Sequence, residues 1–188
     1  MRIAVLIPCF NEEVAVGDVV REFRKELPHA EIAVFDNNST DRTVARAAEA
    51  GAHVSFERRQ GKGFVVQRMF HEIDADIYIM VDGDRTYPPN AVHRLIEPIV
   101  RGEADMVVGS RLQPESRSAF RALNRLGNRL FASAVSAASG LKLTDIFSGY
   151  RAFSREFSAG MGSRSFVARS LPSAQGHFRI GKAAFCFC

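Results

Sequence analysis

Short runs rich in hydrophobic residues alternate along this chain with longer stretches in which hydrophobic positions recur every three or four residues. The short runs are typical of strands buried on both faces, and the wider spacing is typical of helices that cover such strands. The expected strands are 3–7, 32–35, 53–56, 77–81 and 106–108, and the expected helices are 12–27, 41–50, 63–73, one opened by Pro89, and 118–139. Strands separated by helices predict an α/β fold with a mostly parallel central sheet flanked by helices.

The last 32 residues break this pattern. They contain no acidic residue, whereas residues 1–156 hold all 21 acidic residues and 21 of the 25 basic ones. The body is therefore neutral and the net charge of +4 comes from the tail, so the basic balance does not indicate a nucleic-acid partner. We expect residues 1–156 to form one domain and residues 157–188 to form an atypical, poorly ordered tail.

The composition is that of a globular protein, with 46% hydrophobic and 24% charged residues. No uncharged apolar run approaches the roughly 18–20 residues of a transmembrane helix. The three cysteines, Cys9, Cys186 and Cys188, do not make a disulfide framework, and we expect Cys9 to be a core residue of the first loop. These features predict a cytoplasmic protein, with the cytoplasmic face of the membrane as a further place of action.

Polar residues follow every expected strand. They occupy positions 8–13, 36–41, 58–63, 82–84 and 109–111. Ligands of open parallel sheets bind beyond the carboxyl ends of the strands, so these five segments should converge on one edge and form a binding site there.

Asp82-Gly83-Asp84 is the most informative of these segments. Two carboxylates flank a glycine directly after a buried strand, and their spacing lets both reach toward one divalent cation. Mg²⁺ and Mn²⁺ prefer oxygen ligands and are commonly shared between carboxylates and substrate phosphates. A metal site is the first interpretation, and an acidic β-turn without a ligand is the second.

Basic residues offer weaker signals. Gly61-Lys62-Gly63 follows a strand and opens a helix, where phosphate binds readily, but it lacks the spacing of a P-loop. Arg117, Arg121, Arg125 and Arg129 recur at every fourth position of an expected helix. This stripe is either a solvated face or a face toward a phosphate or an anionic membrane surface.

Residues 148–151 read as part of a buried strand, and Asp145 and Arg151 could form a structural ion pair. The five histidines are scattered and no cluster has the spacing of zinc ligands.

The segments together resemble family 2 glycosyltransferases, and are most similar to the branch of dolichol-phosphate mannose synthase and the bacterial polyprenyl-phosphate sugar transferases. The matching segments are 5–12, 35–41, 61–63, 82–84, 109–111 and 148–151. The resemblance covers about residues 1–156 and implies a GT-A fold, a nucleotide-sugar donor and a divalent cation, Mg²⁺ or Mn²⁺. The family continues beyond Glu156 with parts of the acceptor side, so we expect this domain to be incomplete at its C-terminal side.

The resemblance also implies roles for single residues. The first loop would lie against the nucleoside through Pro8, Phe10, Asn11 and Glu12. Asp36 would bind the base, and Lys62 would lie near the nucleotide. Asp82 would lie near the ribose and the metal, and Asp84 would ligate the metal. Arg111 and Arg121 are candidates for the donor diphosphate or an acceptor phosphate. Many relatives have two acids where this chain has Asp36-Asn37, a departure that bears on base recognition.

The function implied is an inverting transfer of a sugar from a UDP- or GDP-linked donor to a lipid phosphate, with Asp82, Asp84 and Arg111 as the catalytic residues. Two alternatives stay open at this point. One is a family 2 transferase that acts on a sugar hydroxyl in polysaccharide or glycolipid synthesis, and the other is an inactive, truncated form that binds a nucleotide sugar.

Overall fold

The computed structural model describes residues 1–110, 148–162 and 183–187, with side chains described for residues 1–109 and 148–158. Several sequence predictions lie outside these residues. They are the helix expected at 118–139 with its arginine stripe, the site candidates Arg111 and Arg121, and the proposed partner of Arg151, Asp145.

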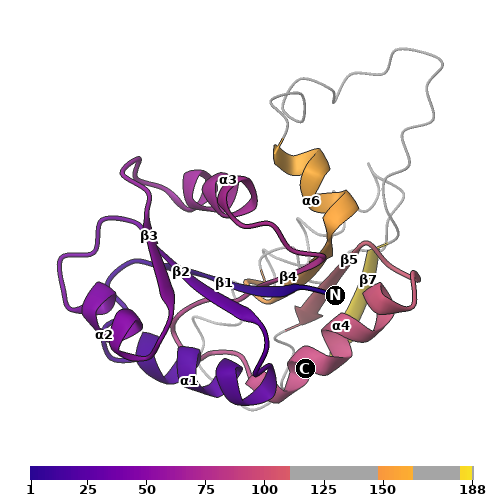
Figure 1. The fold of residues 1–188 in the computed structure, drawn as a ribbon, viewed down its shortest axis with the longest axis horizontal. Helices are drawn as coiled ribbons and strands as arrows, with labels where there is room; N and C mark the ends of the chain where they lie inside the picture. The colour runs from indigo at the N-terminus through magenta and orange to yellow at the C-terminus, as the bar shows by residue number, and fades with distance from the viewer. Residues whose placement is uncertain (111–147, 163–182, 188) are drawn as a thin grey trace, which may run out of the picture.

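A seven-stranded sheet forms the centre of the molecule (Figure 1). Its spatial order is β3-β2-β1-β4-β6-β5-β7. The strands are β1 (Ile3–Cys9), β2 (Glu31–Asp36), β3 (His53–Phe56), β4 (Ile77–Met80), β5 (Met106–Ser110), β6 (Arg151–Ser154) and β7 (Ala183–Phe187). The pairs β1–β2, β1–β4, β2–β3 and β5–β7 are parallel, and β6 runs antiparallel to both of its neighbours. The expected strands and the mostly parallel sheet are therefore confirmed.

Helices cover both faces of the sheet (Figure 1). They are α1 (Val16–Glu26), α2 (Thr43–Glu49), α3 (Lys62–Glu72), the short 3-10 helix η1 (Pro89–Ala91), α4 (Val92–Val100) and α6 (Arg155–Gly162). Helices α1, α2 and α4 pack on one face, and α3 and α6 pack on the other. No helix in the described parts of the chain is both long and apolar enough to cross a membrane.

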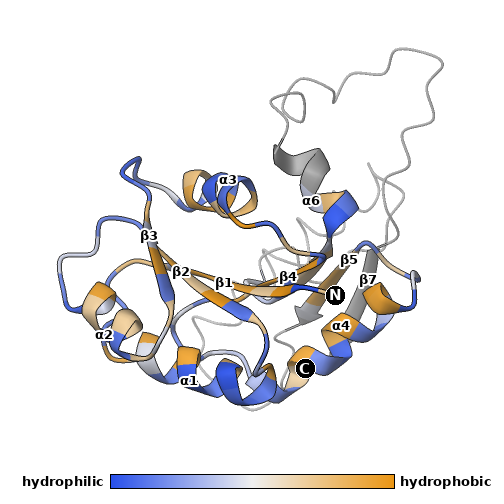
Figure 2. Cartoon of the chain, viewed as in Figure 1, coloured by the Kyte–Doolittle hydropathy of each residue, from blue (hydrophilic) through white to orange (hydrophobic). Residues whose placement is uncertain are grey.

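The central strands are hydrophobic on both sides because each face has its own helical layer. In β1, Val5 and Ile7 join the core under α1, whereas Ala4 and Leu6 join the core under α3. Figure 2 shows this run of hydrophobic residues along β1, β2 and β4. Side chains of a strand alternate between its two faces, so a continuous apolar run fills both cores at once.

Helix α1 begins four residues later than its hydrophobic spacing predicts. The N–H groups of Ala15 and Val16 both donate to the carbonyl of Glu12, at 3.1 and 3.0 Å, so 12–15 form a turn that leads into the helix. From Val16 onward the predicted face is buried, and Phe23 at its end packs edge-on against Tyr150 with ring centroids 6.0 Å apart. Residues 12–15 therefore belong to the loop at the edge of the sheet and not to the helix.

Two elements lie at or beyond the boundary expected at residue 156. Helix α6 spans it, and β7 pairs in parallel with β5, with Met106 opposite Ala183. The sequence pattern predicts neither element. The division of the chain at residue 156 stays a prediction.

Candidate functional site

The loops that follow β1, β2, β3 and β4 meet at one edge of the sheet. These four strands are mutually parallel. The register places Cys9 opposite Asp36 and Asp36 opposite Phe56, so β1, β2 and β3 end level, whereas β4 ends at Met80, opposite Leu6. Strand β5 runs in the same direction because the antiparallel β6 separates it from β4. The convergence expected from the sequence is therefore present for the described loops.

Hydrogen bonds between backbone N–H groups and side-chain oxygens connect the first loop to the second loop and the start of α2. The N–H of Asn11 donates to Ser39 Oγ at 2.9 Å, and the side-chain carbonyl of Asn11 accepts from the N–H of Thr40 at 2.8 Å. The N–H of Glu12 donates to Thr43 Oγ1 at 2.7 Å. Asn11 has a φ of +55°, a left-handed conformation that asparagine tolerates better than most residues. The polar groups of Asn11 therefore shape the edge of the sheet, while Phe10 beside it is half exposed.

Asp36 ends β2 and is 3% exposed. Its Oδ2 accepts a hydrogen bond from the N–H of Ser39 at 3.1 Å. Its Oδ1 is also buried but accepts no hydrogen bond from any residue that the structure describes. Buried carboxylate oxygens almost always have a partner, so Oδ1 stands out as an unsatisfied acceptor at the end of β2.

Asp82 lies between Lys62 and Gly149. Lys62 Nζ, at the start of α3, is 2.6 Å from Asp82 Oδ1, and the Asp82 side chain is only 18% exposed. On the other side, a Cβ added to Gly149 would lie 1.9 Å from Asp82 Oδ2, so any side chain at position 149 would force the Asp82 carboxylate or the Gly149 backbone to move. The hydroxyl of Tyr87 holds Gly149 in place by accepting from its N–H at 2.6 Å.

Asp84 is exposed, and its Oδ1 accepts from the N–H of Thr86 at 2.9 Å. Gly83 between the two acids lies against Cys9, whose Sγ would be 2.7 Å from a Cβ at position 83. Cys9 is buried, as expected for a core residue of the first loop. The next residue, Arg85, has a φ of +59° and forms ion pairs with two carboxylates of α1. The backbone of the acidic turn is therefore held by the packing of Gly83 on Cys9 and by the ion pairs of Arg85.

The carboxylates at this edge create a negative field. Burial, followed by the charges of Asp84 and Asp82, raises the pKa of Glu12 above its ordinary value. Burial also raises the pKa of the Cys9 thiol, and the carboxylates of Glu12 and Asp36 raise it further. A site of this charge attracts cations.

The carboxylates at this edge fit a hard divalent cation whose remaining ligands would come from a bound phosphate. Asp82 and Asp84 carry carboxylate oxygens, the ligand type that Mg²⁺ and Mn²⁺ prefer, and would be the residues that hold such an ion. Within the described residues, no group of three or more His, Cys, Asp or Glu side chains is placed to hold a metal. Two carboxylates are the usual protein share when substrate phosphates supply further ligands.

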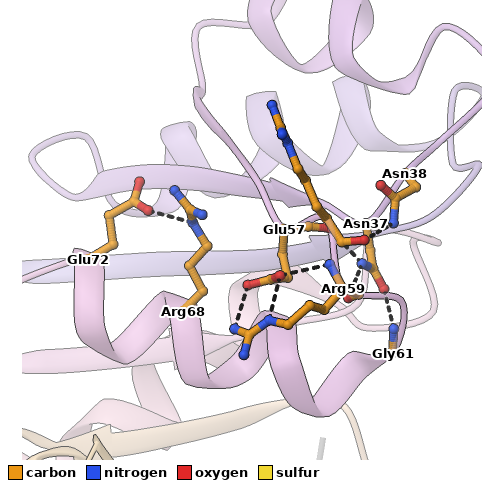
Figure 3. A network of polar contacts seen from close by, with 8 residues as sticks. Asn37, Asn38, Glu57, Arg59, Gly61, Arg68 and Glu72 are labelled. Carbon is orange, nitrogen blue, oxygen red and sulfur yellow. Dashed lines mark hydrogen bonds and ion pairs between the residues drawn. The ribbon is translucent and has the colours of Figure 1, made fainter.

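The third loop is tied to the second by Asn37 (Figure 3). Its Nδ2 donates to the carbonyls of Glu57 and Arg59 at 2.8 and 2.9 Å, and its Oδ1 accepts from the N–H of Gly61 at 2.8 Å. Within the loop, the hydrogen-bonded guanidinium of Arg59 lowers the pKa of Glu57 to about 2. The same guanidinium lies 4.6 Å from the ring centre of Phe64.

A cleft of about 470 Å³ lies apart from these groups, between α1 and α2. Its lining includes Arg21 and Arg46, each ion-paired with a neighbouring acid, and does not include Asp36, Asp82 or Asp84. We assign it no part in the site.

Sequence reasoning missed Tyr87 and the contact role of Gly149. The hydroxyl of Ser148 also donates to the carbonyl of Gly109, so residues 148–149 are held directly beside Asp82. The sequence marked residues 148–151 as a segment that resembles the family and as part of a strand, but β6 begins only at Arg151, and the topology brings Gly149 to the carboxyl edge because that strand is antiparallel.

The arrangement of sheet and helices is that of GT-A glycosyltransferases. Glucosyl-3-phosphoglycerate synthase from Mycobacterium tuberculosis, crystallised with Mn²⁺, UDP-glucose and phosphoglyceric acid, superposes with a TM-score of 0.68 at 26% identity. The match covers 83% of this chain and 57% of that one. The predicted GT-A fold is confirmed.

The model of the family described as "Glycosyl transferase family 2" matches residues 4–160, and the chain belongs to this family. It is 47% identical over 119 residues to protein RfbJ of Shigella flexneri, a match that covers 63% of this chain and 92% of RfbJ. It is 37% identical to glycosyltransferase AglJ of Haloferax volcanii, covering 82% of this chain and 50% of AglJ. A dolichyl-phosphate hexose transferase of the same organism is 32% identical, with 82% of this chain and 67% of that protein covered. The chain thus spans nearly all of RfbJ but only half of AglJ.

Proposed function

We propose that this chain forms the donor side of a metal-dependent, inverting glycosyltransferase that moves a sugar from a nucleoside diphosphate to a polyprenyl phosphate. The observation that carries the proposal is one edge of the sheet at which three groups converge. They are the acidic pair Asp82 and Asp84, the ammonium of Lys62, and the buried acceptor Oδ1 of Asp36. Relatives named as dolichyl-phosphate hexose transferase and dolichol-phosphate mannosyltransferase support the choice of acceptor.

The base and ribose would lie along the ends of β1 and β2. Asp36 Oδ1 would accept a hydrogen bond from the base, which gives this buried oxygen a partner. Phe10, 50% exposed, offers an aromatic surface to the nucleoside, and Pro8, Asn11 and Glu12 complete the first loop. A uracil and a guanine both carry N–H groups that such an acceptor can bind, so UDP- and GDP-linked donors are both candidates.

The diphosphate would lie across Asp82 and Asp84. These carboxylates would hold Mg²⁺ or Mn²⁺, which supplies Lewis-acid stabilisation of the departing diphosphate when it is bound. Lys62 would add a positive charge beside the same oxygens, because its Nζ already lies 2.6 Å from Asp82. Arg111 and Arg121 remain predicted phosphate ligands.

The reaction would be a single displacement at the anomeric carbon. An oxygen of the acceptor phosphate forms the new bond to that carbon while the bond to the nucleoside diphosphate breaks, and the configuration inverts. A phosphate monoester is already ionised near neutral pH, since its second pKa is about 6, so the attacking oxygen needs no strong general base.

Calorimetry with UDP and GDP, each with and without Mn²⁺, tests the donor half of the proposal. Wild-type protein should bind one of the nucleotides in a Mn²⁺-dependent way, and Asp84→Ala should abolish that dependence. Asp74→Ala is the matched control, because Asp74 is an exposed acid that pairs with Arg2 and Arg155. Unchanged Mn²⁺-dependent binding by Asp84→Ala would contradict the assignment.

A transfer assay tests the acceptor half. Wild-type protein, Mn²⁺ and a panel of radiolabelled UDP- and GDP-sugars are incubated with polyprenyl phosphate in detergent, and lipid-soluble label is counted. Labelled lipid supports the proposal. Label that appears only on an added oligosaccharide would favour the hydroxyl acceptor, and nucleotide binding without any transfer would favour a binding form of the chain.

A further inference from the structure

Asn37 directs both of its side-chain N–H groups and its side-chain oxygen to the backbone of the third loop. A carboxamide has two N–H donors and one carbonyl acceptor, and here both donors and the acceptor bind residues 57–61 (Figure 3). The residue is 5% exposed. Its side chain is therefore turned into the protein, and its contribution to nucleotide recognition must be indirect.

The segment that Asn37 holds starts helix α3. Gly61 has a φ of +132°, which L side chains rarely adopt, and its carbonyl accepts from the N–H of Phe64 at 3.0 Å. Lys62 follows as the first residue of the helix, and its Nζ reaches Asp82. A continuous chain of contacts thus runs from Asn37 through Gly61 to Lys62 and the acidic pair.

An acid at position 37 cannot make the same contacts. An aspartate has the same shape, but it has no donor for the carbonyls of Glu57 and Arg59 and would place a negative charge 2.8–2.9 Å from their oxygens. Only the bond from the N–H of Gly61 would survive. The identity of residue 37 and the course of residues 57–61 are therefore coupled.

We propose that Asn37 is a positioning residue that holds the third loop so that Lys62 is presented to the diphosphate side of the site. The inference rests on the proposed function, because the target of Lys62 is the donor diphosphate. In the sequence, Asn37 stands next to Asp36 and therefore suggested an effect on base recognition. The inference assigns to it an effect on phosphate binding instead.

The first test measures the loop without any ligand. Asn37→Asp should raise the hydrogen-exchange rate of the Gly61 amide by about tenfold or more, because two hydrogen bonds that hold this loop are lost. Asn90→Asp is the matched control. It makes the same chemical change at an exposed position of η1, outside the third loop. Equal exchange rates in the two variants would overturn the proposal.

The second test is a double-mutant cycle on nucleotide binding with Mn²⁺, using whichever of UDP and GDP the wild type binds. Asn37→Asp should weaken binding by about tenfold, and Lys62→Ala should weaken it by at least as much. The double variant should bind no more weakly than Lys62→Ala alone, because Asn37 acts through Lys62. A general loss of folding would instead add to the effect of Lys62→Ala, and additive losses would overturn the proposal.

Asn37→Ala is the second variant, for the case that the aspartate does not fold. It removes all three bonds without introducing a charge, and the same non-additivity with Lys62→Ala is expected. If Lys62→Ala leaves nucleotide binding unchanged, Lys62 does not contact the phosphates and the inference about Asn37 fails. The proposed function can still hold in that case, because Mn²⁺-dependent binding is measured separately. If the wild type binds no nucleotide, the proposed function fails, and the exchange of the Gly61 amide still decides whether Asn37 holds the loop.

Discussion

Replacing Gly149 by alanine should disable the site at a modest cost in stability. The new Cβ would lie 1.9 Å from Oδ2, 2.4 Å from Cγ and 2.6 Å from Oδ1 of Asp82. The closest contact must open by about 1.5 Å to reach ordinary van der Waals separation. Either Asp82 rotates away and loses Lys62, or Gly149 moves and loses the 2.6 Å hydrogen bond to Tyr87.

Both routes disturb the acidic pair, but they differ in their effect on the fold. Rotation of Asp82 moves only the end of a flexible side chain, whereas a shift of the backbone next to β6 strains a buried strand. Overpacking in protein interiors costs about 1–3 kcal/mol. In a chain of this size that corresponds to a fall in Tm of roughly 2–12 °C. The Mn²⁺-dependent nucleotide binding of Gly149→Ala should fall below detection in calorimetry.

Gly17→Ala is the matched control for this variant. Gly17 lies in α1, and a Cβ there would make only ordinary contacts of 3.4–3.5 Å. Gly17 is the second residue of α1, and alanine is favoured over glycine in helices by at most about 0.5–1 kcal/mol, so this variant should melt at or slightly above the wild-type temperature and bind nucleotide normally. Normal Mn²⁺-dependent binding by Gly149→Ala would refute the placement of Gly149 against Asp82.

Leu95→Ala, at a fully buried position of α4, should lower the free energy of unfolding by about 2–5 kcal/mol in urea titrations, and a loss below about 1 kcal/mol would contradict its place in the core. Arg85→Gly should be more stable than Arg85→Ala by about 0.5–1 kcal/mol in the same titrations. Both variants lose the exposed ion pairs of Arg85, but only glycine adopts the positive φ of this position without strain. A more stable Arg85→Ala would contradict the turn geometry. Glu57 has a pKa lowered from 4.5 to about 2, so its stabilising contribution is present above pH 4.5 and is lost as the pH falls toward 2. The wild type should therefore lose stability more steeply than Glu57→Gln across that range, and parallel curves would argue against the Glu57–Arg59 pair.

The sheet could be predicted from the sequence because its central strands are apolar on both faces. A short, fully apolar run such as Ile3–Ile7, in a chain where such runs alternate with helical segments, is typical of a strand buried on both faces. The start of α1 was misplaced, because Glu12 fits the helical spacing but its carbonyl closes a turn instead. The antiparallel direction of β6 was also not predictable, since hydrophobic pattern carries no information on strand direction.

The candidate site, too, was only partly predictable from the sequence. Asp36, Lys62 and Asp82 were found because each follows a strand, and topology alone brings such residues to one edge. Gly149 and Tyr87 were missed because their importance comes from one close approach between segments more than sixty residues apart. Asn37 was noticed as part of a polar loop and as a departure from the family pattern, but its structural role was not. Its partners are backbone groups, which have no signature in the sequence.

The position of β6 between β4 and β5 has a consequence for how the polypeptide assembles on the ribosome. Both hydrogen-bonded neighbours of β5, which are β6 and β7, are synthesised after it. The nascent chain must therefore carry β5 with both of its edges open until residues 151–154 emerge and insert beside β4. The N-terminal strands β1 to β4 can pair before that moment, whereas the half of the sheet built on β5 can form only after residues 151–154 and 183–187 have been synthesised.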